Sequence, residues 1–397
     1  MSLGTLLTLF IITNWQFFQV EGNVGQEYIF YSNATHISYV SVDGGESTAI
    51  LSAQSATLGY DEQNYRLWYY DTVGVTLHNA NLDGSDLRTL SVLSNFGPFT
   101  VDAVNQSIYY LNNDDNSVKS IDYNGNLFPE IAALQSGSDF KDLQIDAYNR
   151  SLFLTTDRMN SRNLIRYSLP EDAELTIDDN ITGIGTHLAV DTSNKIVYWI
   201  HFTDDTDYKI YKTTYDGQTS QIGPEQTGSL TTVDIGEGNG FFYILDSGTS
   251  EVRKYNKTTD TVDSTISLSP GAARMIVVAD KDSCAVNNTC PANSTCTNIP
   301  GTIVCSCNTG FTGNQTFCQD INECTESPCG FNSNCTNIIG SFLCECQTGF
   351  EGNVTNCTDI NECQTDPCDV NAACTNTNGS YSCNCNAGYE GNGTSCT

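Results

Sequence analysis

The chain has 397 residues, which is more than one ordinary domain usually holds. Hydrophobic residues make up 39 % of it, enough for a packed core, and the formal net charge is −31. Nucleic acids and anionic membranes attract proteins through basic patches. We therefore expect neither as a direct partner; the charge favours cationic partners, cations, or simply solubility.

The first 22 residues differ from the rest. They contain the apolar run LGTLLTLFII, which has the length of a secretory signal and is short for a membrane span. Val20 and Gly22 suit the −3 and −1 positions of a cleavage site, although no Lys or Arg precedes the run. We expect a signal peptide at 1–22 and a secreted, extracellular protein. No later segment is apolar enough to be transmembrane.

A short pattern recurs along residues 23–280: Asp, two residues, Asn, then an apolar-aromatic run. It is found as DEQNYRLWY (61–69), DAVNQSIYY (102–110), DAYNRSLFL (146–154) and DTSNKIVYW (191–199), and more weakly as GEGNGFFYI (236–244). The first bulky residues of the aromatic pairs lie 38 to 45 residues apart, at Phe30, Trp68, Tyr109, Phe153, Tyr198 and Tyr243. A period of about 40–45 residues with several short strands predicts the blades of a β-propeller.

Each repeat predicts four strands. An inner strand such as LAV (188–190) leads into the Asp-x-x-Asn turn, whose side chains can bond to nearby backbone NH groups. The aromatic strand follows, and a third strand ends at a hairpin signal. These signals are Asp43-Gly44, Asp83-Gly84, Asn124-Gly125 and Asp216-Gly217. We interpret the recurring motif as a structural turn rather than a catalytic element.

The ends of this region indicate how the ring closes. The strand YIFYSN (28–33) has almost no mature chain before it, so its inner strand is missing. Residues 274–280, RMIVVAD, have an inner-strand pattern with no blade after them. We expect residues 274–280 to supply the inner strand of the first of six blades, since an open ring would leave a hazardous strand edge.

The aromatic tetrapeptides Trp68-Tyr69-Tyr70-Asp71 and Phe30-Tyr31-Ser32-Asn33 resemble the YWTD repeats of the low-density-lipoprotein receptor and nidogen. So do the runs that follow, such as NANLDGSDLRTL (79–90). In that family a six-bladed propeller is followed directly by an EGF module. No repeat here reads YWTD itself, so the resemblance implies the fold and leaves the ligand open.

All eighteen cysteines lie between Cys284 and Cys396, which marks a second architecture. An even number at regular spacing in a secreted chain predicts a disulfide framework, with all-cysteine zinc sites as the alternative. The spacing is 5-5-8-1-10 in residues 284–318 and 4-5-8-1-10 in both 324–357 and 363–396. Six cysteines alone allow fifteen pairings in each module.

These spacings resemble EGF modules, here at 281–319, 320–358 and 359–397, so the fold class is all-β with three small disulfide-rich modules. The resemblance implies first–third, second–fourth and fifth–sixth pairing. The implied bonds are Cys284–Cys296, Cys290–Cys305, Cys307–Cys318, Cys324–Cys335, Cys329–Cys344, Cys346–Cys357, Cys363–Cys374, Cys368–Cys383 and Cys385–Cys396. Modules of about forty residues have little core and depend on such bonds.

The second and third modules also resemble the calcium-binding EGF type, because DINEC occurs at 320–324 and 359–363, with CTNIIGSF (335–342) and CTNTNGSY (374–381) downstream. Calcium prefers six to eight hard oxygen ligands. The resemblance implies side-chain oxygens of Asp320, Glu323 and Asn337 with the carbonyls of Ile321, Ile338 and Ser341, and in the last module Asp359, Glu362 and Asn376 with the carbonyls of Ile360, Thr377 and Ser380. The alternative is a solvated acidic turn.

The first module departs from this pattern, because DKDSC (280–284) places Ser283 where Glu is expected. We expect no calcium there and two Ca²⁺ sites in all. By the same resemblance, Phe311 would pack on Ile339 and Gly340, and Phe350 on Asn378 and Gly379. Each calcium ion would lie at a junction between modules, so we expect calcium to stiffen the tail.

Thirteen Asn-x-Ser/Thr sequons are present. Several of them should carry glycans in a secreted protein. The expected sites include Asn33, Asn105, Asn149, Asn180, Asn256 and Asn293.

The pattern as a whole predicts a non-catalytic extracellular protein of matrix, adhesion or receptor-ectodomain type that binds other extracellular proteins. The alternative is a calcium-dependent hydrolase or lyase, because six-bladed propellers also host such enzymes. We find no nucleophile–base constellation, so we expect no enzyme. A metal bound in the central channel of the propeller would favour the alternative.

Overall fold

The structure is a computed structural model, and the signal peptide predicted at 1–22 lies outside its described residues. Those residues are 24–53, 57–92, 95–129, 131–133, 140–156, 164–170, 173–178, 184–202, 207–227, 233–286, 288–353 and 356–397. The chain divides into two compact units, one reaching Val286 and including Asn298–Ile303, the other formed by Asn287–Thr297 and Val304–Thr397.

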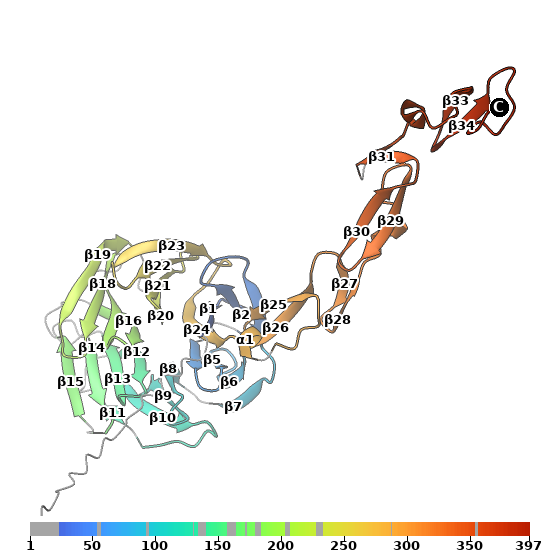
Figure 1. Ribbon diagram of the computed structural model, residues 1–397. Helices are drawn as coiled ribbons and strands as arrows, with labels where there is room; N and C mark the ends of the chain where they lie inside the picture. Colours follow the sequence, from blue (N-terminus) through green and yellow to red (C-terminus); the bar gives the residue numbers. More distant parts are fainter. Residues whose placement is uncertain are drawn as a thin grey trace, which may run out of the picture. The chain divides into compact units, whose positions relative to one another are not determined.

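Six four-stranded antiparallel sheets form the blades of a propeller (Figure 1). Blade 1 is made of β24 (Arg274–Lys281), β1 (Val24–Ser32), β2 (His36–Ser41) and β3 (Thr48–Ser52). Blade 2 is made of β4 (Thr57–Asp61), β5 (Arg66–Asp71), β6 (Thr76–Asn81) and β7 (Arg88–Val92). Blade 3 is made of β8 (Phe96–Asp102), β9 (Ser107–Asn112), β10 (Ser117–Asp122) and β11 (Ala132–Ala133).

The remaining blades follow the same order from the inner strand outward. Blade 4 is made of β12 (Phe140–Asp146), β13 (Ser151–Thr156), β14 (Leu164–Ser168) and β15 (Ala173–Asp178). Blade 5 is made of β16 (Ile184–Asp191), β17 (Ile196–Phe202), β18 (Asp207–Thr214) and β19 (Thr219–Thr227). Blade 6 is made of β20 (Val233–Gly238), β21 (Phe241–Asp246), β22 (Glu251–Asn256) and β23 (Thr261–Ser267).

The ring closes as the sequence predicts. β24 pairs antiparallel with β1, with Phe30 opposite Ile276 and Ser32 opposite Arg274. The last propeller strand therefore becomes the inner strand of blade 1, and Figure 1 shows the two lying side by side. Closure gives β1 a partner along an edge that would otherwise be open.

The aromatic strands form the core between blades. The six repeat residues Phe30, Trp68, Tyr109, Phe153, Tyr198 and Tyr243 are all 5 % exposed or less. Tyr198 of blade 5 stacks on Phe242 of blade 6, with ring centroids 4.6 Å apart. Buried aromatic pairs of this kind add about 0.5–1.5 kcal/mol beyond their burial. The core is thus a ring of clusters, each shared by neighbouring blades.

The predicted hairpin signals lie between the third and fourth strands. Gly44, Gly84, Gly125 and Gly217 all have φ between 82° and 91°, where only glycine is unstrained. Gly84 has a second constraint, because a Cβ there would lie 2.8 Å from the carbonyl oxygen of Ile50. These glycines are required by backbone geometry.

The Asp-x-x-Asn motif is a turn between the first and second strands. In blade 4, the buried Asp146 accepts a 3.0 Å bond from the Asn149 backbone NH and a 2.7 Å bond from its side-chain Nδ2. Blade 6 lacks the Asp because its turn is shorter, with only Asn239 and Gly240 between β20 and β21. The structural interpretation of the motif holds.

The same four carboxylates also bond to the next blade, which the sequence did not indicate. Each accepts a hydrogen bond or ion pair from a side chain of the following blade. The pairs are Tyr123 Oη with Asp61 (2.8 Å), Arg150 Nη1 with Asp102, Tyr215 Oη with Asp146 (2.9 Å) and Lys257 Nζ with Asp191 (2.7 Å). Every motif Asp therefore organises its own turn and attaches the neighbouring blade.

The C-terminal modules are small β-hairpins held by disulfides. The first holds α1 (Ser283–Val286), β25 (Ser294–Ile299), β26 (Thr302–Cys307), β27 (Phe311–Asn314) and β28 (Phe317–Asp320). The second holds η1 (Glu323–Glu326), β29 (Ser333–Ile338), β30 (Ser341–Cys346), β31 (Phe350–Asn353) and β32 (Asn356–Asp359). The third holds η2 (Glu362–Thr365), β33 (Ala372–Thr377) and β34 (Ser380–Cys385).

Disulfides link every cysteine of these modules. The pairs are 290–305, 307–318, 324–335, 329–344, 346–357, 363–374, 368–383 and 385–396, as the resemblance implied. The other two cysteines, Cys284 and Cys296, are also disulfide-bonded. No cysteine in the described residues is free for zinc.

Candidate functional site

Two of the expected calcium ligands of the second module, Asp320 and Asn337, lie together at its N-terminal end. Asp320, the last residue of β28, accepts a 2.7 Å bond from Asn337 Nδ2 and another from the Gly340 backbone NH. Ile338 and Ser341 face each other where β29 turns into β30. A carboxylate, an amide and two backbone carbonyls thus lie around one hairpin tip.

The third module repeats this geometry. Asp359, the last residue of β32, accepts a 2.6 Å bond from Asn376 Nδ2 and another from the Gly379 NH. Thr377 and Ser380 occupy the same facing positions across the hairpin. The same contacts at equivalent residues of two modules indicate that this arrangement is a specific feature of both.

The glutamates supply the most specific observation. Glu323 and Glu362 begin η1 and η2, the short 3₁₀ helices after these aspartates. The Oε2 atom of each is buried, and among the described residues it has no hydrogen-bond partner. An unpaired buried carboxylate oxygen costs several kcal/mol unless a cation or donor meets it. A hard divalent cation fits this donor set of carboxylates, amide and carbonyls.

The first module satisfies its polar groups internally instead. Asn298 accepts a 2.9 Å bond from the Cys284 NH and donates a 2.7 Å bond to Asp282 Oδ1. The bond from Asn298 is the main reason that the pKa of Asp282 is below its usual range. Asp280 accepts a 2.7 Å bond from the Gly301 NH. With Ser283 in place of the glutamate, no buried carboxylate oxygen in the described part of this module lacks a partner.

The modules of the second unit pack tightly at their junctions. The Gly310 carbonyl accepts a 2.9 Å bond from the Ile321 NH, and the Gly349 carbonyl accepts a 3.0 Å bond from the Ile360 NH. A Cβ on Gly349 would lie 2.2 Å from the Gly379 oxygen. These contacts lie directly beside the two candidate calcium sites.

The expected aromatic packing is present in part. Phe311 and Phe350 lie against the faces of Gly340 and Gly379, because a Cβ on those glycines would be 3.0 and 2.8 Å from the rings. The Ile339 side chain, however, is 82 % exposed, so it does not cover Phe311. The glycine, which allows close approach, makes the contact, and that part of the expectation was wrong.

The tip of the first module's hairpin, Asn298–Ile303, belongs to the same compact unit as the propeller. Tyr28 Oη donates a 3.1 Å bond to the Asn298 carbonyl, and a Cβ on Gly301 would lie 3.1 Å from the Asp83 nitrogen. Gly301 has φ +76°, as Gly340 and Gly379 do at +78° and +77°. A propeller loop thus lies against this glycine, as the aromatic rings do against the other two.

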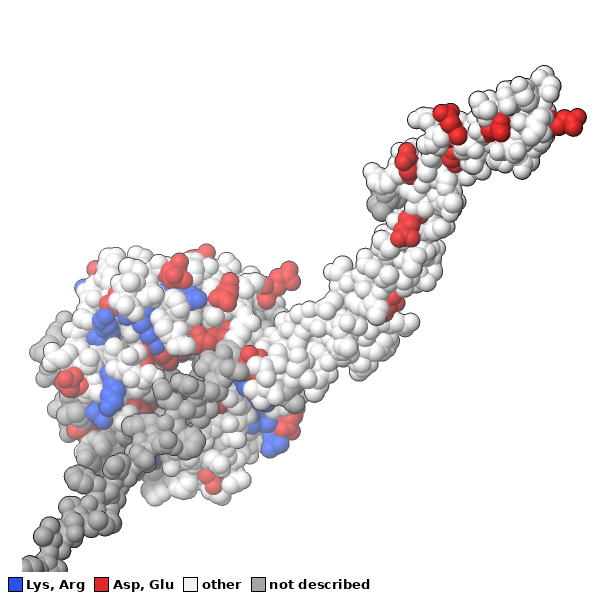
Figure 2. Space-filling view, in the orientation of Figure 1, with Lys and Arg blue, Asp and Glu red and all other residues white. Residues whose placement is uncertain are grey.

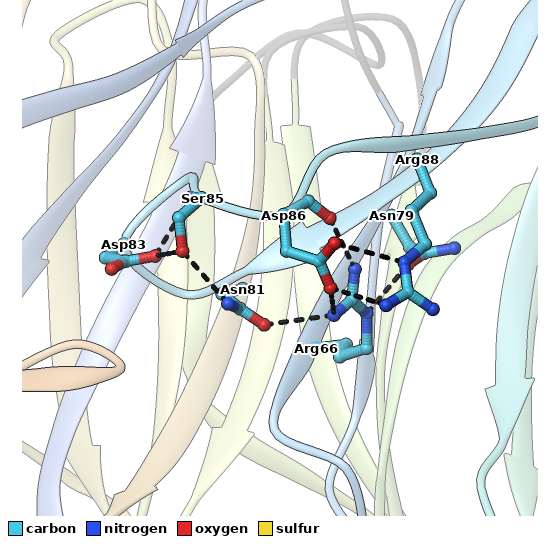
Figure 3. Close-up of polar contacts among 7 residues, drawn as sticks. All are labelled: Arg66, Asn79, Asn81, Asp83, Ser85, Asp86 and Arg88. Atoms are coloured by element: carbon cyan, nitrogen blue, oxygen red, sulfur yellow. Dashed lines mark hydrogen bonds and ion pairs between the residues drawn. The ribbon is translucent and has the colours of Figure 1, made fainter.

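That propeller loop is held by Arg66 (Figure 3). The Arg66 guanidinium donates to Asn79 Oδ1 at 2.7 Å and to Asn81 Oδ1 at 3.0 Å, and pairs with Asp86 at 2.9 Å. Asp86 also forms an ion pair with Arg88. Hydrogen bonds from both arginines lower the pKa of Asp86 below its usual range. Arg66 therefore fixes the β6–β7 loop against which the hairpin tip lies.

The propeller encloses a central channel of about 240 Å³. Asp142, Asp234 and Arg274 line it. His187 lies 3.6 Å from both carboxylates and 2.9 Å from the Arg274 guanidinium. One oxygen of Asp142 accepts the Leu188 NH and one of Asp234 the Met275 NH, so both carboxylates tie adjacent inner strands together. No local pattern in the sequence indicated this cluster.

The acidic loop at 112–116 is a paired hairpin tip. Asp115 pairs with Lys119 at 2.5 Å, and that bond lowers the pKa of Asp115 below its usual range. Asp114 accepts a bond from Asn95. Another acidic segment of the sequence, TDDTD (203–207), lies almost wholly outside the described residues. The tail after Lys281, in contrast, carries acidic but no basic residues (Figure 2).

Known proteins are similar to this chain in both its EGF-like modules and its propeller. A calcium-binding EGF domain family matches residues 320–357, and an EGF domain family matches residues 362–396. The propeller is similar to a chain in the crystal structure of a nidogen/laminin complex, at 11 % identity over 63 % of this chain and 98 % of that one, with a TM-score of 0.55. TolB from Acinetobacter baumannii is similar at 10 % identity over 64 % and 66 %, with a TM-score of 0.48.

The fold and the modules define the class: an extracellular-type protein with a nidogen-like six-bladed propeller and EGF-like modules, of which at least one is the calcium-binding type. At 11 % identity the likeness to nidogen shows the fold alone. Among the described residues, no helix is both long and apolar enough to cross a bilayer. Calcium-binding EGF domains and dense disulfides are typical of extracellular protein-interaction proteins.

Proposed function

We propose that the protein is secreted and non-catalytic, and that it binds other extracellular proteins through its propeller while two calcium ions stiffen its EGF-like tail. The observation that carries the proposal is the buried, unpartnered Oε2 of Glu323 and Glu362. Each lies in the segment that connects one module to the next. A cation at these oxygens would satisfy the charge and hold the junction together.

The first ion would be held by Asp320, Glu323 and Asn337 with the carbonyls of Ile321, Ile338 and Ser341. The second would be held by the equivalent set, Asp359, Glu362 and Asn376 with the carbonyls of Ile360, Thr377 and Ser380. Calcium supplies electrostatic cross-linking of oxygen ligands rather than chemistry. It also offsets repulsion among the eleven acidic residues that follow Lys281.

Stiffening follows from where the ions would lie. Only Gln319 separates Cys318 from Asp320, and only Thr358 separates Cys357 from Asp359, so each linker has little freedom. Glycine-to-carbonyl contacts already limit rotation at both junctions. An ion bound by residues on both sides of the linker would remove most of the remaining freedom.

The test is small-angle scattering of the secreted chain in calcium and in chelator, together with protease cleavage at residues 318–320 and 357–359. We expect a longer maximum dimension and slower junction cleavage in calcium. An unchanged dimension with unchanged cleavage would show that calcium has no structural role. Extracellular sites of this kind bind at about 10⁻⁴–10⁻³ M, so the titration must span that range.

The propeller is proposed as the binding platform because the polar side chains of Asp142, Asp234 and Arg274 line its channel, with His187 beside them. Immobilised full-length chain should retain extracellular proteins. Arg274→Gln should weaken that retention, whereas Glu362→Gln, which changes only the tail, should not.

The hydrolase or lyase alternative rests on the two carboxylates that line the channel and on the histidine beside them. Metal analysis of the double variant Glu323→Gln/Glu362→Gln separates the alternatives. A metal that remains bound would favour an enzyme with a channel site, and a metal-free double variant would favour the binding protein.

A further inference from the structure

The sequons of the propeller fall into two groups, which differ in the amide atom that the fold uses. In Asn105 and Asn149 the fold uses the nitrogen Nδ2, the atom that N-glycosylation modifies. In Asn33 and Asn256 it uses the oxygen Oδ1. Asn180 lies outside the described residues.

Asn105 and Asn149 are the asparagines of the Asp-x-x-Asn turns. Asn105 Nδ2 donates to both oxygens of Asp102, at 3.2 and 3.1 Å, and Asn149 Nδ2 donates to Asp146 Oδ2 at 2.7 Å. Both aspartates are 0 % exposed. A sugar on either nitrogen would replace one of its two hydrogens and place a bulky group beside the buried carboxylate that attaches the next blade.

Two other blades show that these asparagines serve the turn. Asn64 and Asn194 donate the same bond from Nδ2, to Asp61 at 2.9 Å and to Asp191 at 2.8 Å, yet neither is in a sequon. The hydroxyl residue of the Asn149 sequon also has a structural role. Ser151 Oγ donates to the Asn149 carbonyl and accepts two bonds from Arg166.

In Asn33 and Asn256 the amide oxygen, and not the nitrogen, makes the hydrogen bonds of the turn. Asn33 Oδ1 accepts the backbone NH groups of Thr35 and His36 at 2.9 and 2.8 Å. Asn256 Oδ1 accepts those of Thr258 and Thr259 at 2.9 and 3.1 Å. Among the described residues, neither Nδ2 donates a hydrogen bond, so a substituent on it leaves the turn intact.

The EGF-like modules contain the second arrangement twice more. Asn314 Oδ1 accepts the Thr316 NH at 2.9 Å and its hydroxyl at 2.7 Å. Asn392 Oδ1 accepts the Thr394 NH at 3.1 Å and its hydroxyl at 2.9 Å. Both asparagines are exposed. The threonine of the sequon already contacts the amide that would be modified.

From this contrast we infer that Asn33, Asn256, Asn314 and Asn392 carry N-linked oligosaccharides in the secreted protein, and that Asn105 and Asn149 do not. The donor is an oligosaccharide on a polyprenyl pyrophosphate. A bond forms between Asn Nδ2 and the sugar C1 while the C1–O bond to pyrophosphate breaks. Nδ2 loses one proton, and the lipid pyrophosphate leaves.

Transfer takes place on the chain before it has folded, so folding selects among the modified chains. A glycan on Nδ2 of Asn33 or Asn256 leaves the turn intact, because the hydrogen bonds of that turn go to Oδ1. A glycan on Asn105 or Asn149 must be accommodated against a blade-to-blade contact. Chains modified there fold poorly and are depleted from the secreted pool.

The test is site mapping of the secreted full chain with peptide-N-glycosidase in ¹⁸O water, which marks each formerly glycosylated asparagine. Complete tryptic digestion places Asn105 alone in peptide 89–119 and Asn149 alone in peptide 142–150. We expect both unmarked, and marks on the other four asparagines. Marks on Asn105 or Asn149 in most molecules, or none on Asn33 and Asn256, would overturn the inference.

A matched series of Asn→Asp variants adds a second readout. Asn33→Asp and Asn256→Asp keep the Oδ1 acceptor, so each should lose one glycan with little change in Tm. Asn105→Asp should lose no glycan and should lower Tm by roughly 2–8 °C, because it replaces a donor with a second negative charge. Asn64→Asp, in the same turn without a sequon, should lower Tm similarly. A glycan lost in Asn105→Asp would contradict the inference.

The inference rests on the proposed secretion. A chain that is secreted with a different set of glycans overturns the inference alone. A chain that is neither secreted nor glycosylated at any site overturns the extracellular function as well.

Discussion

Tyr215 Oη donates a 2.9 Å hydrogen bond to Asp146 Oδ2, joining blade 5 to blade 4. Asp146 is 0 % exposed and already holds the Asn149 turn of its own blade. Burial, and then the Asp146 charge, raises the pKa of Tyr215 well above its usual value, so the phenol remains a donor at physiological pH. Repeated in neighbouring blades, this contact ties the ring together.

Tyr215→Phe removes this donor and leaves a buried carboxylate with one partner fewer. We expect the propeller to lose about 1–3 kcal/mol of unfolding free energy. Chemical denaturation followed by tryptophan fluorescence measures it. Tyr39→Phe is the control, because among the described residues the Tyr39 hydroxyl makes no hydrogen bond. Equal losses in both variants would refute a special role for the Tyr215 bond.

Glu237 makes the stability of the propeller depend on pH. Burial raises the pKa of this carboxyl to about 7, although Lys257, which contacts it, lowers it in part. A folded-state pKa above the unfolded value means that the neutral form is favoured by folding. Its contribution is fully present below about pH 4.5 and is lost as the pH rises toward 7.

Glu237→Gln keeps the shape of the side chain and removes this titration. The difference in unfolding free energy between variant and native chain should grow in favour of the variant between pH 4.5 and 7.5, by on the order of 2 kcal/mol. Thermal unfolding across that range in calcium-free buffer measures it. Parallel curves for the two proteins would rule out titration of Glu237 as the cause.

Gly349 tests the junction between the second and third modules. Gly349 has φ +87°, and a Cβ there would lie 2.2 Å from the Gly379 oxygen. Gly388, the equivalent residue of the third module, has φ +96° but open space around it. Both Ala variants cost about 1–2 kcal/mol of backbone strain, and only Gly349→Ala adds a clash.

We therefore expect Gly349→Ala to speed protease cleavage at residues 357–359 in calcium, and Gly388→Ala to leave that rate unchanged. If the two variants cleave alike, close packing at this glycine does not limit motion at the junction.

Local patterns in the sequence were enough to predict the propeller. The spacing of neighbouring repeat residues, such as Trp68 and Tyr109, indicated the blade period, and the apolar run at 274–280 indicated ring closure. Both features could be predicted because aromatic burial and strand alternation determine the types of residues that are close together in the sequence. The short turn at Asn239 also explains why the motif weakens in blade 6.

Contacts between distant residues could not be predicted in the same way. Lys257 bonds to Asp191, which lies 66 positions away in the sequence, and no pattern near either residue predicts the other as its partner. The packing of Phe311 was placed on the correct hairpin, but Ile339 proved exposed because a backbone turn, not a side chain, faces the ring. The unpartnered oxygen of Glu323 is likewise visible only in three dimensions.

Calorimetric titration of the full chain with calcium tests the central claim most directly. We predict two ions per chain at about 10⁻⁴–10⁻³ M for the native protein, and one ion for each of Glu323→Gln and Glu362→Gln, since each removes one charged ligand of one site. Each variant should keep the affinity of its intact site. No calcium uptake by the native chain, or two ions still bound at native affinity in both variants, would contradict the account.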